Sequence, residues 1–377
     1  MRLVPINCIK PGSYLSKSIY DAEGRILLAQ GVELTSLILN KIKHHGIMSL
    51  YIQDEYSDNE IEDIIQPELR QKAIQTVKNY FDYSNFKQAK NSNSNEKNNM
   101  QYEYIKSLNE VAENIVEEII SQKEILINLV DIKIMDNYTY AHCVNVAVLS
   151  LVLGIEMGFN KKQLYDIAVG AMLHDIGKVF IPNDILNKKG GLTKNEFEII
   201  KKHPQLGYDY LKDIYDINAF ARGIVLQHHE RLDGSGYPKG LEEDQIHTFA
   251  KIVAIADNYD ALTSDRPYRK PISPNDALEY IMGSAGRFFD YDMVKAFMDK
   301  IIPYPIGTLV RLSNGCIGVI DAITPFSPLR PKVKVIMGNE SFLKDEIIDL
   351  YENYSIVIEG VQYEDPVEVK GDKVLGF

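Results

Sequence analysis

The sequence predicts a mainly α protein, with an all-helical core between a small α/β module at the amino terminus and a small β module at the carboxyl terminus. Three observations predict this fold class. Through the middle of the chain, apolar residues recur three or four positions apart, as in a helix that buries one face. Residues 1–55 mix short β-type runs with one helix, and the residues after Pro303 alternate or run β-branched. At 377 residues, two or three domains are expected.

The amino-terminal α/β module is predicted over residues 1–85. Short β-type runs surround three glycines, a helix lies near residues 34–45, and a strand-like run follows at 50–52. The remainder, residues 56–85, is polar and predicted to be helical. The pair His44-His45 is expected to be solvated or to cap the helix rather than to bind metal.

A flexible linker is predicted over residues 86–101. Residues 88–99 form a low-complexity tract rich in Asn, Ser and Lys, which buries too little apolar surface to order itself. The tract therefore divides the amino-terminal module from the rest of the chain.

The helical core is predicted over residues 102–302 and begins with a long helix near Tyr102. The apolar stripe of this helix consists of Ile105, Leu108, Val111, Ile115 and Ile119. We expect the stripe to pack on its own domain, because it is short of the several heptads of a coiled coil. A homodimer through this helix is the alternative.

The carboxyl-terminal β module is predicted over residues 303–377. Its strand patterns cover residues 307–312, 316–323 and 332–337, and a Ser-Asn-Gly turn and a proline-rich turn separate them. We expect a small barrel-like or meander module that braces the core.

Composition limits the classes of function. A net charge of −12 argues against a general DNA or RNA binder, because neutralising a nucleic-acid backbone requires basic patches. Charge interrupts the apolar stretches before about 18 residues, so no membrane insertion is expected, and the amino terminus lacks a signal-peptide pattern. The scattered cysteines Cys8, Cys143 and Cys316 fit a cytoplasmic protein rather than a disulfide framework.

An ordered series of metal-type ligands is the most informative feature of the chain. The series consists of His142, His174, Asp175, His203, His228, His229 and Asp257. Neutral imidazoles suit first-row metals such as Mn, Fe, Co and Zn, and a carboxylate can bridge two such ions. Asp175 is the candidate bridge.

Lys178 adds a cation to this series. Asp175 and Lys178 are three residues apart at the end of an apolar helix, so both project toward one face. Taken alone, the segment would fit a buried His-Asp hydrogen bond with a Lys reaching solvent. The adjacent imidazoles His228 and His229 are awkward in an apolar core, however, and a dinuclear centre satisfies several buried nitrogens together.

A glycine-rich loop follows this histidine pair. Residues 231–240 contain three glycines and one proline, so they cannot continue a helix and must form a tight loop. The loop is neither a GxGxxG dinucleotide loop nor a Walker loop.

These motifs together resemble the HD-GYP family, a branch of the HD phosphohydrolases that hydrolyses cyclic di-GMP. The resemblance covers about residues 104–302. Its motifs are His174-Asp175-Ile-Gly-Lys178, His203-Pro204, His228-His229-Glu230-Arg231-Leu-Asp233-Gly-Ser-Gly236-Tyr237-Pro238 and Ala-Asp257-Asn-Tyr-Asp260-Ala-Leu-Thr-Ser-Asp265-Arg266-Pro-Tyr-Arg269. Their length and order make the signal strong, and they imply an HD-type fold for the helical core.

The resemblance implies roles for individual residues. One metal would be bound by His142, His174, Asp175 and Asp257, and the second by Asp175, His203, His228 and His229. Substrate would be contacted by Lys178, Tyr237, Arg266 and Arg269, and the catalytic residues would be Asp175 and Lys178.

Two metal ions are expected rather than three. Some members of the family look trinuclear and carry a Glu four residues before the first His ligand, but this chain has Tyr138 there. A phenol is a poor ligand for Fe or Mn at neutral pH. Asp136 is the alternative third-site ligand. The ligand set fits Fe or Mn.

The expected function is hydrolysis of cyclic di-GMP to pGpG and, with a second cleavage, GMP. Two cations can activate a bridging hydroxide for in-line attack on a phosphodiester, and the sequence has no serine triad or activated cysteine that would replace it. The alternatives are a phosphodiesterase for another cyclic dinucleotide such as cyclic GMP-AMP, a non-catalytic cyclic di-GMP receptor, and a di-iron oxygenase.

Overall fold

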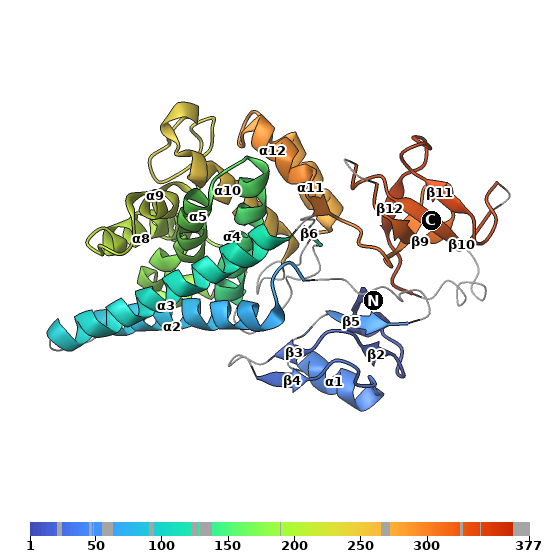
Figure 1. The fold of residues 1–377 in the computed structure, drawn as a ribbon, viewed down its shortest axis with the longest axis horizontal. Helices are drawn as coiled ribbons and strands as arrows, with labels where there is room; N and C mark the ends of the chain where they lie inside the picture. Colours follow the sequence, from blue (N-terminus) through green and yellow to red (C-terminus); the bar gives the residue numbers. More distant parts are fainter. Residues whose placement is uncertain are drawn as a thin grey trace.

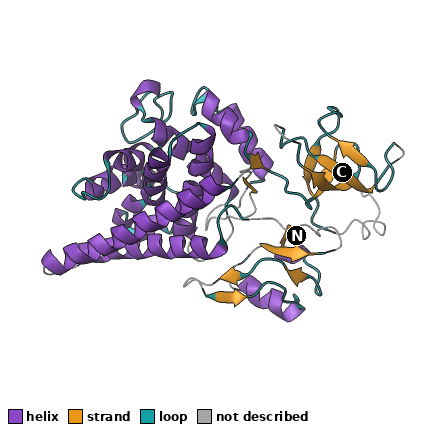
Figure 2. Ribbon diagram, in the orientation of Figure 1, coloured by secondary structure: helices purple, strands orange, loops and turns teal. Residues whose placement is uncertain are grey.

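The computed structural model confirms the predicted fold class, with a helical body accompanied by two small β-containing modules (Figure 1 and Figure 2). It describes residues 1–20, 25–44, 47, 49–54, 63–89, 94–122, 127–128, 138–188, 190–264, 272–324, 327–339 and 341–364. In Figure 1 the helical body lies on the left, and the two modules lie on the right.

The amino-terminal module is a three-stranded antiparallel sheet with a hairpin and one helix. Its elements are β1 (Arg2–Pro5), the 3-10 helix η1 (Ile6–Cys8), β2 (Tyr14–Leu15), β3 (Ile19–Tyr20), β4 (Ile26–Leu28), α1 (Ser36–His44) and β5 (Ser49–Gln53). The sheet order is β1-β5-β2. Alternate residues of the strands face inward, so that Val4, Leu50 and Ile52 pack with Leu34 and Ile42.

The helical body contains the long helices and several short ones. They are α2 (Pro67–Ala89), α3 (Ser94–Ser121), α4 (Tyr138–Glu156), α5 (Lys161–Leu173), η3 (Ile176–Phe180), α6 (Asn183–Leu186), α7 (Lys194–Ile200), α8 (His203–Leu211), α9 (Ala219–Gln227), η4 (Glu243–Gln245), α10 (Thr248–Thr263), α11 (Pro274–Gly283) and α12 (Tyr291–Met298). The central helix α4 packs against α2, α5, α10 and α12.

The position of α4 explains its composition. Its residues Thr139–Glu156 form an 18-residue stretch with a mean hydropathy of 1.4, long and apolar enough to cross a membrane by those measures alone. The prediction that charge interrupts every apolar stretch sooner is therefore wrong. However, 78% of the stretch is buried inside the structure, and a helix surrounded by other helices is apolar on all sides for that reason.

Helix α2 belongs to the helical body by its packing. Ile74, Val77 and Phe81 share one hydrophobic cluster with residues of α3, α4 and α10. The Phe81 ring meets the Tyr140 ring of α4 edge-on, with centroids 5.5 Å apart. The predicted boundaries at 85 and 102 remain predictions, but the packed helical core includes buried residues from Ile64 onward.

The structure differs from the predicted flexible linker at 86–101. Helix α2 continues to Ala89 and α3 begins at Ser94, so only residues 90–93 of that range lie outside the described helices. Gln, Lys, Ala and Glu have good helix propensity, and a helix already held by packing extends at low cost. Low apolar content therefore does not by itself break the two helices, which lie side by side in Figure 1.

The apolar stripe of α3 packs within the chain, as predicted. The five residues of the stripe, from Ile105 to Ile119, are all buried in the main hydrophobic cluster. A homodimer through this helix remains a prediction, and it would have to use the opposite face of α3.

The carboxyl-terminal module is a five-stranded antiparallel sheet of order β11-β10-β9-β8-β12. Its strands are β8 (Leu309–Leu312), β9 (Ile317–Ala322), β10 (Lys332–Met337), β11 (Ile347–Asp349) and β12 (Ile358–Val361). Its own core includes Val310, Leu312, Ile320, Val333 and Val335. Just before it, β7 (Ile301–Ile302) pairs in parallel with β6 (Ile127–Asn128).

The packing of α2 predicts that Phe81→Ala destabilises the helical body. Phe81 is fully buried against α4, and removing such a ring costs about 3–5 kcal/mol. Urea unfolding followed by circular dichroism measures the change. The control Tyr102→Ala removes an exposed side chain of α3 and should change stability by less than about 0.5 kcal/mol. Equal stability of the two variants would show that α2 does not belong to the core.

Candidate metal centre

In three of the predicted ligands, a hydrogen bond from the ring to a backbone carbonyl orients the imidazole. The Nδ1 atoms of His174, His203 and His228 lie 2.7, 2.8 and 2.9 Å from the carbonyl oxygen three residues earlier. These carbonyls belong to the last turns of α5, α7 and α9, where the regular pattern of helical hydrogen bonds ends. A carbonyl oxygen only accepts, so each Nδ1 carries the proton and each Nε2 carries a lone pair.

Two of these lone pairs point at each other. The Nε2 atoms of His203 and His228 are 3.2 Å apart, and neither has a proton to share. Burial, together with His229, lowers the pKa of His203 to about 3 and holds the pKa of His228 well below its usual value. Both rings are therefore neutral. Imidazole nitrogens lie about 2.0–2.1 Å from a bound ion such as zinc, so a cation shared by both nitrogens fits this arrangement.

Asp175 lies between two groups of imidazoles. Its Oδ1 is 3.4 Å from Nε2 of His203, while its Oδ2 is 3.4 Å from Nε2 of His174 and 3.8 Å from Nε2 of His142. Among the described residues, Oδ1 has no hydrogen-bond partner. Burial would raise the pKa of Asp175, but Lys178 and His174 hold it well below the usual value. A buried carboxylate with one oxygen toward each group has the geometry of a bridging ligand.

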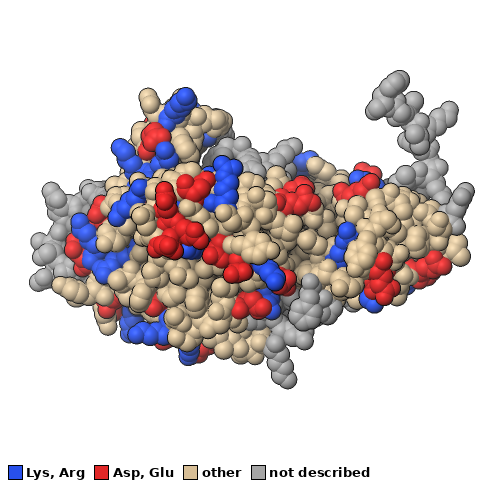
Figure 3. All heavy atoms as spheres, turned by 90° about the horizontal axis from the view of Figure 1, so that it is seen from above, with Lys and Arg blue, Asp and Glu red and all other residues tan. Residues whose placement is uncertain are grey.

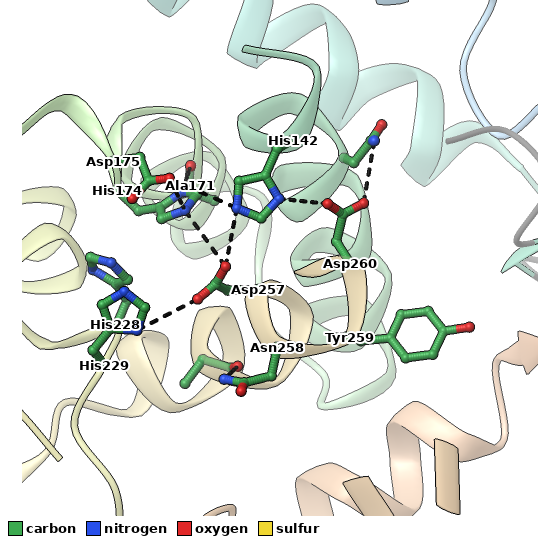
Figure 4. Close-up of polar contacts among 12 residues, drawn as sticks. His142, Ala171, His174, Asp175, His228, His229, Asp257, Asn258, Tyr259 and Asp260 are labelled. Atoms are coloured by element: carbon green, nitrogen blue, oxygen red, sulfur yellow. Dashed lines mark hydrogen bonds and ion pairs between the residues drawn. The ribbon is translucent and has the colours of Figure 1, made fainter. Parts of the chain in front are cut away.

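Asp257 of α10 joins the two groups on another side. Its Oδ1 lies 3.1 Å from Nε2 of His142, and its Oδ2 lies 3.7 Å from Nδ1 of His229. Figure 4 shows the Asp257 carboxylate between these two rings. Burial lowers the pKa of His142, but hydrogen bonds to Asp257 and Asp260 outweigh this and raise it to about 9.

The seven predicted ligands are thus brought together from five segments of the chain. Two sets of ligand atoms each lie within 4.8 Å of one another, namely His203, His228 and His229, and His142, His174 and Asp175. The donor set and the orphaned Asp175 oxygen fit two first-row metal ions. Metal binding by these residues remains a proposal.

Comparisons with known proteins place the chain. Residues 108–293 match the family model of the HD domain, and residues 309–369 match that of a KOW domain associated with the HD domain. A Pseudomonas aeruginosa protein named as a cyclic di-GMP phosphodiesterase is 37% identical over 243 residues, which cover 64% of this chain and 58% of that protein. Residues 108–293 therefore form an HD domain, and the chain is similar to the HD-GYP branch of that family.

Two further relatives bear on specificity. A Borreliella burgdorferi protein, also named as a cyclic di-GMP phosphodiesterase, is 34% identical over 59% of this chain and 58% of its own length. A Vibrio cholerae protein named as a 3'3'-cGAMP-specific phosphodiesterase is 38% identical over 43% of this chain and 37% of its own length. The chain therefore spans less than two thirds of the length of these relatives.

A glycine in the first HD-GYP motif lets two ligand-bearing segments touch. A Cβ atom on Gly177 would lie 1.9 Å from the carbonyl oxygen of His203 and 2.6 Å from the amide nitrogen of Gly207. Only a residue without a side chain allows η3 to cross α8 at this distance. The contact holds the His174-Asp175 pair against His203.

Hydrogen bonds and close backbone contacts hold the glycine-rich loop of residues 231–240 against the His228-His229 pair. The buried Glu230 carboxylate accepts hydrogen bonds of 2.8 and 2.9 Å from the amides of Lys239 and Leu241. A Cβ on Gly236 would lie 2.6 Å from the carbonyl oxygen of His229 and closer still to the next two residues. No role was predicted for Glu230, because its hydrogen-bond partners in the loop are nine and eleven residues away along the chain.

Tyr237 contacts a ligand ring. Its amide donates to the His229 carbonyl at 3.1 Å, and its ring centroid is 4.7 Å from that of His229 with an interplanar angle of 33°. Tyr237 therefore helps to fix the His229 ring. Its predicted contact with substrate remains a prediction.

Several predicted residues lie outside the described part of the chain or outside the site. Arg266, Arg269 and Asp136 are not among the described residues, nor is the side chain of Tyr138, so the roles of the arginines and the count of two metals stay predictions. His247 lies outside the site and caps α10 by accepting from the amide of Phe249 at 3.2 Å.

Sequence reasoning missed Asp260, which bonds Nδ1 of His142 at 2.5 Å. A signal was present, because Asp260 is three residues after the ligand Asp257 on the same helix, and such residues share a face.

The Gly177 contact predicts a large effect of a single methyl group. Gly177→Ala places a Cβ inside the backbone of α8, so η3 or α8 must shift and the distance from Asp175 to His203 must change. We expect a fall in melting temperature and a loss of bound Mn²⁺, measured by differential scanning fluorimetry and metal analysis. The control Gly223→Ala meets no atom within 4 Å in α9, so it should be neutral or stabilising by up to about 1 kcal/mol. Normal Mn²⁺ content in Gly177→Ala would refute the positional role of this glycine.

Proposed function

We propose that the protein is a metal-dependent phosphodiesterase that hydrolyses cyclic di-GMP to pGpG, with GMP as the product of a second cleavage. The observation that carries the proposal is the buried Asp175 carboxylate, which has three imidazole Nε2 atoms within 3.8 Å, distributed over its two oxygens. The names of the Pseudomonas and Borreliella relatives support the choice of substrate.

The ligand set supports two ions, which we propose to be Fe or Mn. A bound pair of such ions supplies an activated water and the positive charge that holds a phosphate oxygen. The residues that would hold one ion are His142, His174, Asp175 and Asp257. The residues that would hold the other are Asp175, His203, His228 and His229.

Lys178 is placed to act on substrate. Its Nζ lies 2.5 Å from Oδ2 of Asp175, and its side chain keeps 23% of its exposure while Asp175 is buried. The ammonium group of Lys178 therefore lies between the seven candidate metal ligands and solvent. From this position it can donate to a phosphate oxygen and stabilise the negative charge that develops there during hydrolysis.

Local positive charge matters because the protein is acidic overall. The net charge is −12, and on the face shown in Figure 3 the basic side chains are interspersed with acidic ones. An anionic dinucleotide must therefore be held by charges at the site itself. We propose Lys178, Arg266 and Arg269 for this role, beside the two metal ions.

A phosphodiesterase for 3'3'-cGAMP is the second candidate, because a relative of similar identity carries that name. The test incubates the purified, Mn²⁺-loaded protein with cyclic di-GMP or 3'3'-cGAMP in parallel and follows linear products by chromatography. We expect pGpG to form faster than any product of 3'3'-cGAMP. The reverse order of rates would change the substrate, and no turnover of either would leave a receptor.

The bridging position of Asp175 predicts that one substitution affects both ions. Asp175→Ala should lower the Mn²⁺ content from two ions per chain to less than one and abolish turnover, because the carboxylate serves both ligand groups. Metal analysis of the purified variant and the chromatographic assay measure these quantities. The control Asp166→Ala removes another buried aspartate and should keep both ions. Two bound ions in Asp175→Ala would rule out the bridge.

The position of Lys178 predicts a loss of rate without a loss of metal. Lys178→Met should lower kcat roughly 10²–10³-fold, the usual effect of removing one donor to a transition-state oxyanion. Lys161→Met, which removes an exposed partner of Glu117, is the control and should leave kcat unchanged. An unchanged kcat in Lys178→Met would contradict a role of Lys178 in stabilising the charge that develops on the phosphate.

A further inference from the structure

We propose that Asp260, Asn145 and Arg70 position His142 by fixing which of its ring nitrogens faces the metal centre. The inference rests on the proposed metal centre and not on the identity of the substrate. All four residues are buried, and Arg70, the most exposed of the four, has 6% of its surface accessible. They form one row of hydrogen bonds that runs from α2 through α4 and α10 to the ligand.

The distances define this row. Nη1 of Arg70 donates to Oδ1 of Asn145 at 2.9 Å, and Nδ2 of Asn145 donates to Oδ1 of Asp260 at 3.3 Å. The other oxygen of Asp260 lies 2.5 Å from Nδ1 of His142. Figure 4 shows the Asp260 carboxylate beside the His142 ring, joined to it by a dashed line.

Arg70 sets the direction of the first two hydrogen bonds, and the Asp260 carboxylate sets the direction of the third. A guanidinium group only donates, so it requires the carbonyl oxygen of Asn145 and turns the amide nitrogen toward Asp260. Asp260, as a carboxylate, accepts at both oxygens. Nδ1 of His142 must then donate, which leaves Nε2 to face Asp257 and the metal centre.

His142 needs this arrangement because of its place in the chain. The other three rings with a fixed Nδ1 use carbonyl oxygens at helix ends. His142 lies within α4, where the carbonyl oxygens already accept helical hydrogen bonds. A side chain must replace the carbonyl, and Asp260 is that side chain. A carboxylate on the outer nitrogen of a ligand histidine fixes its tautomer and raises its basicity.

The far end of the row lies outside the segment that the HD model matches. That match begins at residue 108, whereas Arg70 is in α2. Within the described part of the chain, the only side-chain interaction of Arg70 is its bond to Asn145. A buried guanidinium group is costly unless it is used, and the row gives it a use.

The test measures Mn²⁺ binding by the full-length protein, from the electron paramagnetic resonance signal of free Mn²⁺. In Asp260→Asn the new amide group must turn its nitrogen toward either Asn145 or His142, and both are donors. We expect one of the two ions to bind roughly 10–100-fold more weakly, the usual loss when such a partner is removed. Arg70→Met should weaken the same ion, and Arg70→Lys should restore it because Lys also only donates.

The control is matched to the buried carboxylate. Asp166 is also buried and accepts from Asn218 at 2.5 Å, away from the ligands. Asp166→Asn should lower the melting temperature of the metal-free protein as Asp260→Asn does, and leave both Mn²⁺ affinities unchanged. If Asp260→Asn does not fold, the pair Arg70→Met and Arg70→Lys decides the question.

The outcomes separate this inference from the proposed function. Wild-type affinity in Asp260→Asn or in Arg70→Met would overturn the inference, as would an equal loss in Asp166→Asn or a failure of Arg70→Lys to restore binding. Absence of Mn²⁺ binding by the wild-type protein would instead overturn the metal centre, and with it the proposed function.

Discussion

The convergence of imidazole lone pairs on Asp175 is the constraint on which the rest of the structure depends. In His174, His203 and His228, Nδ1 donates to a backbone carbonyl, so Nε2 points into the site. The Nε2 atoms of His203 and His228 are 3.2 Å apart. Lone pairs at this distance repel each other, and burial keeps both rings neutral. A bound cation would relieve the repulsion and would also use the Asp175 oxygen that has no hydrogen-bond partner among the described residues. The local folding of three helix ends thus produces a site whose electrostatics require positive charge.

Close backbone packing sets where these helix ends stand. Gly177 lets η3 touch the start of α8, and Gly236 lets the loop after α9 touch its own histidine pair. In both places a Cβ atom would overlap with backbone, which cannot move aside as a flexible side chain can. The motif glycines therefore fix the distance between ligands, although they have no chemistry of their own. The Tyr237 ring then packs on His229 and limits its rotation.

The convergence of the seven candidate ligands was predictable from sequence, but their surroundings were not. His174, Asp175 and the pair His228-His229 are unusual residues for apolar helix ends, so each carries its own signal. The sequence holds no signal for the packing partner of α2, because an amphipathic pattern shows that a helix buries one face but not which element covers that face. The helices that cover most of residues 86–101 were not predicted, because composition indicates solvation whereas packed neighbours decide whether a helix continues. The assignment of this tract as a linker remains a prediction. Asp260 and Arg70 were missed because their hydrogen-bond partners, His142 and Asn145, lie 118 and 75 residues away along the chain.

The two halves of the centre differ in the charge that a cation would meet. Burial opposes a charge on His142, yet its hydrogen bonds to Asp257 and Asp260 outweigh burial and raise its pKa to about 9. A metal ion held on that side would take the place of a proton on Nε2, because a ligand nitrogen has to be deprotonated. His203 and His228 are already neutral, so the other side has no proton to release from these rings. Nδ1 of His142 would keep its hydrogen bond to Asp260 with or without a bound metal ion. The row of hydrogen bonds from Arg70 would therefore hold the ring in one orientation, while Nε2 would exchange its proton for the metal ion.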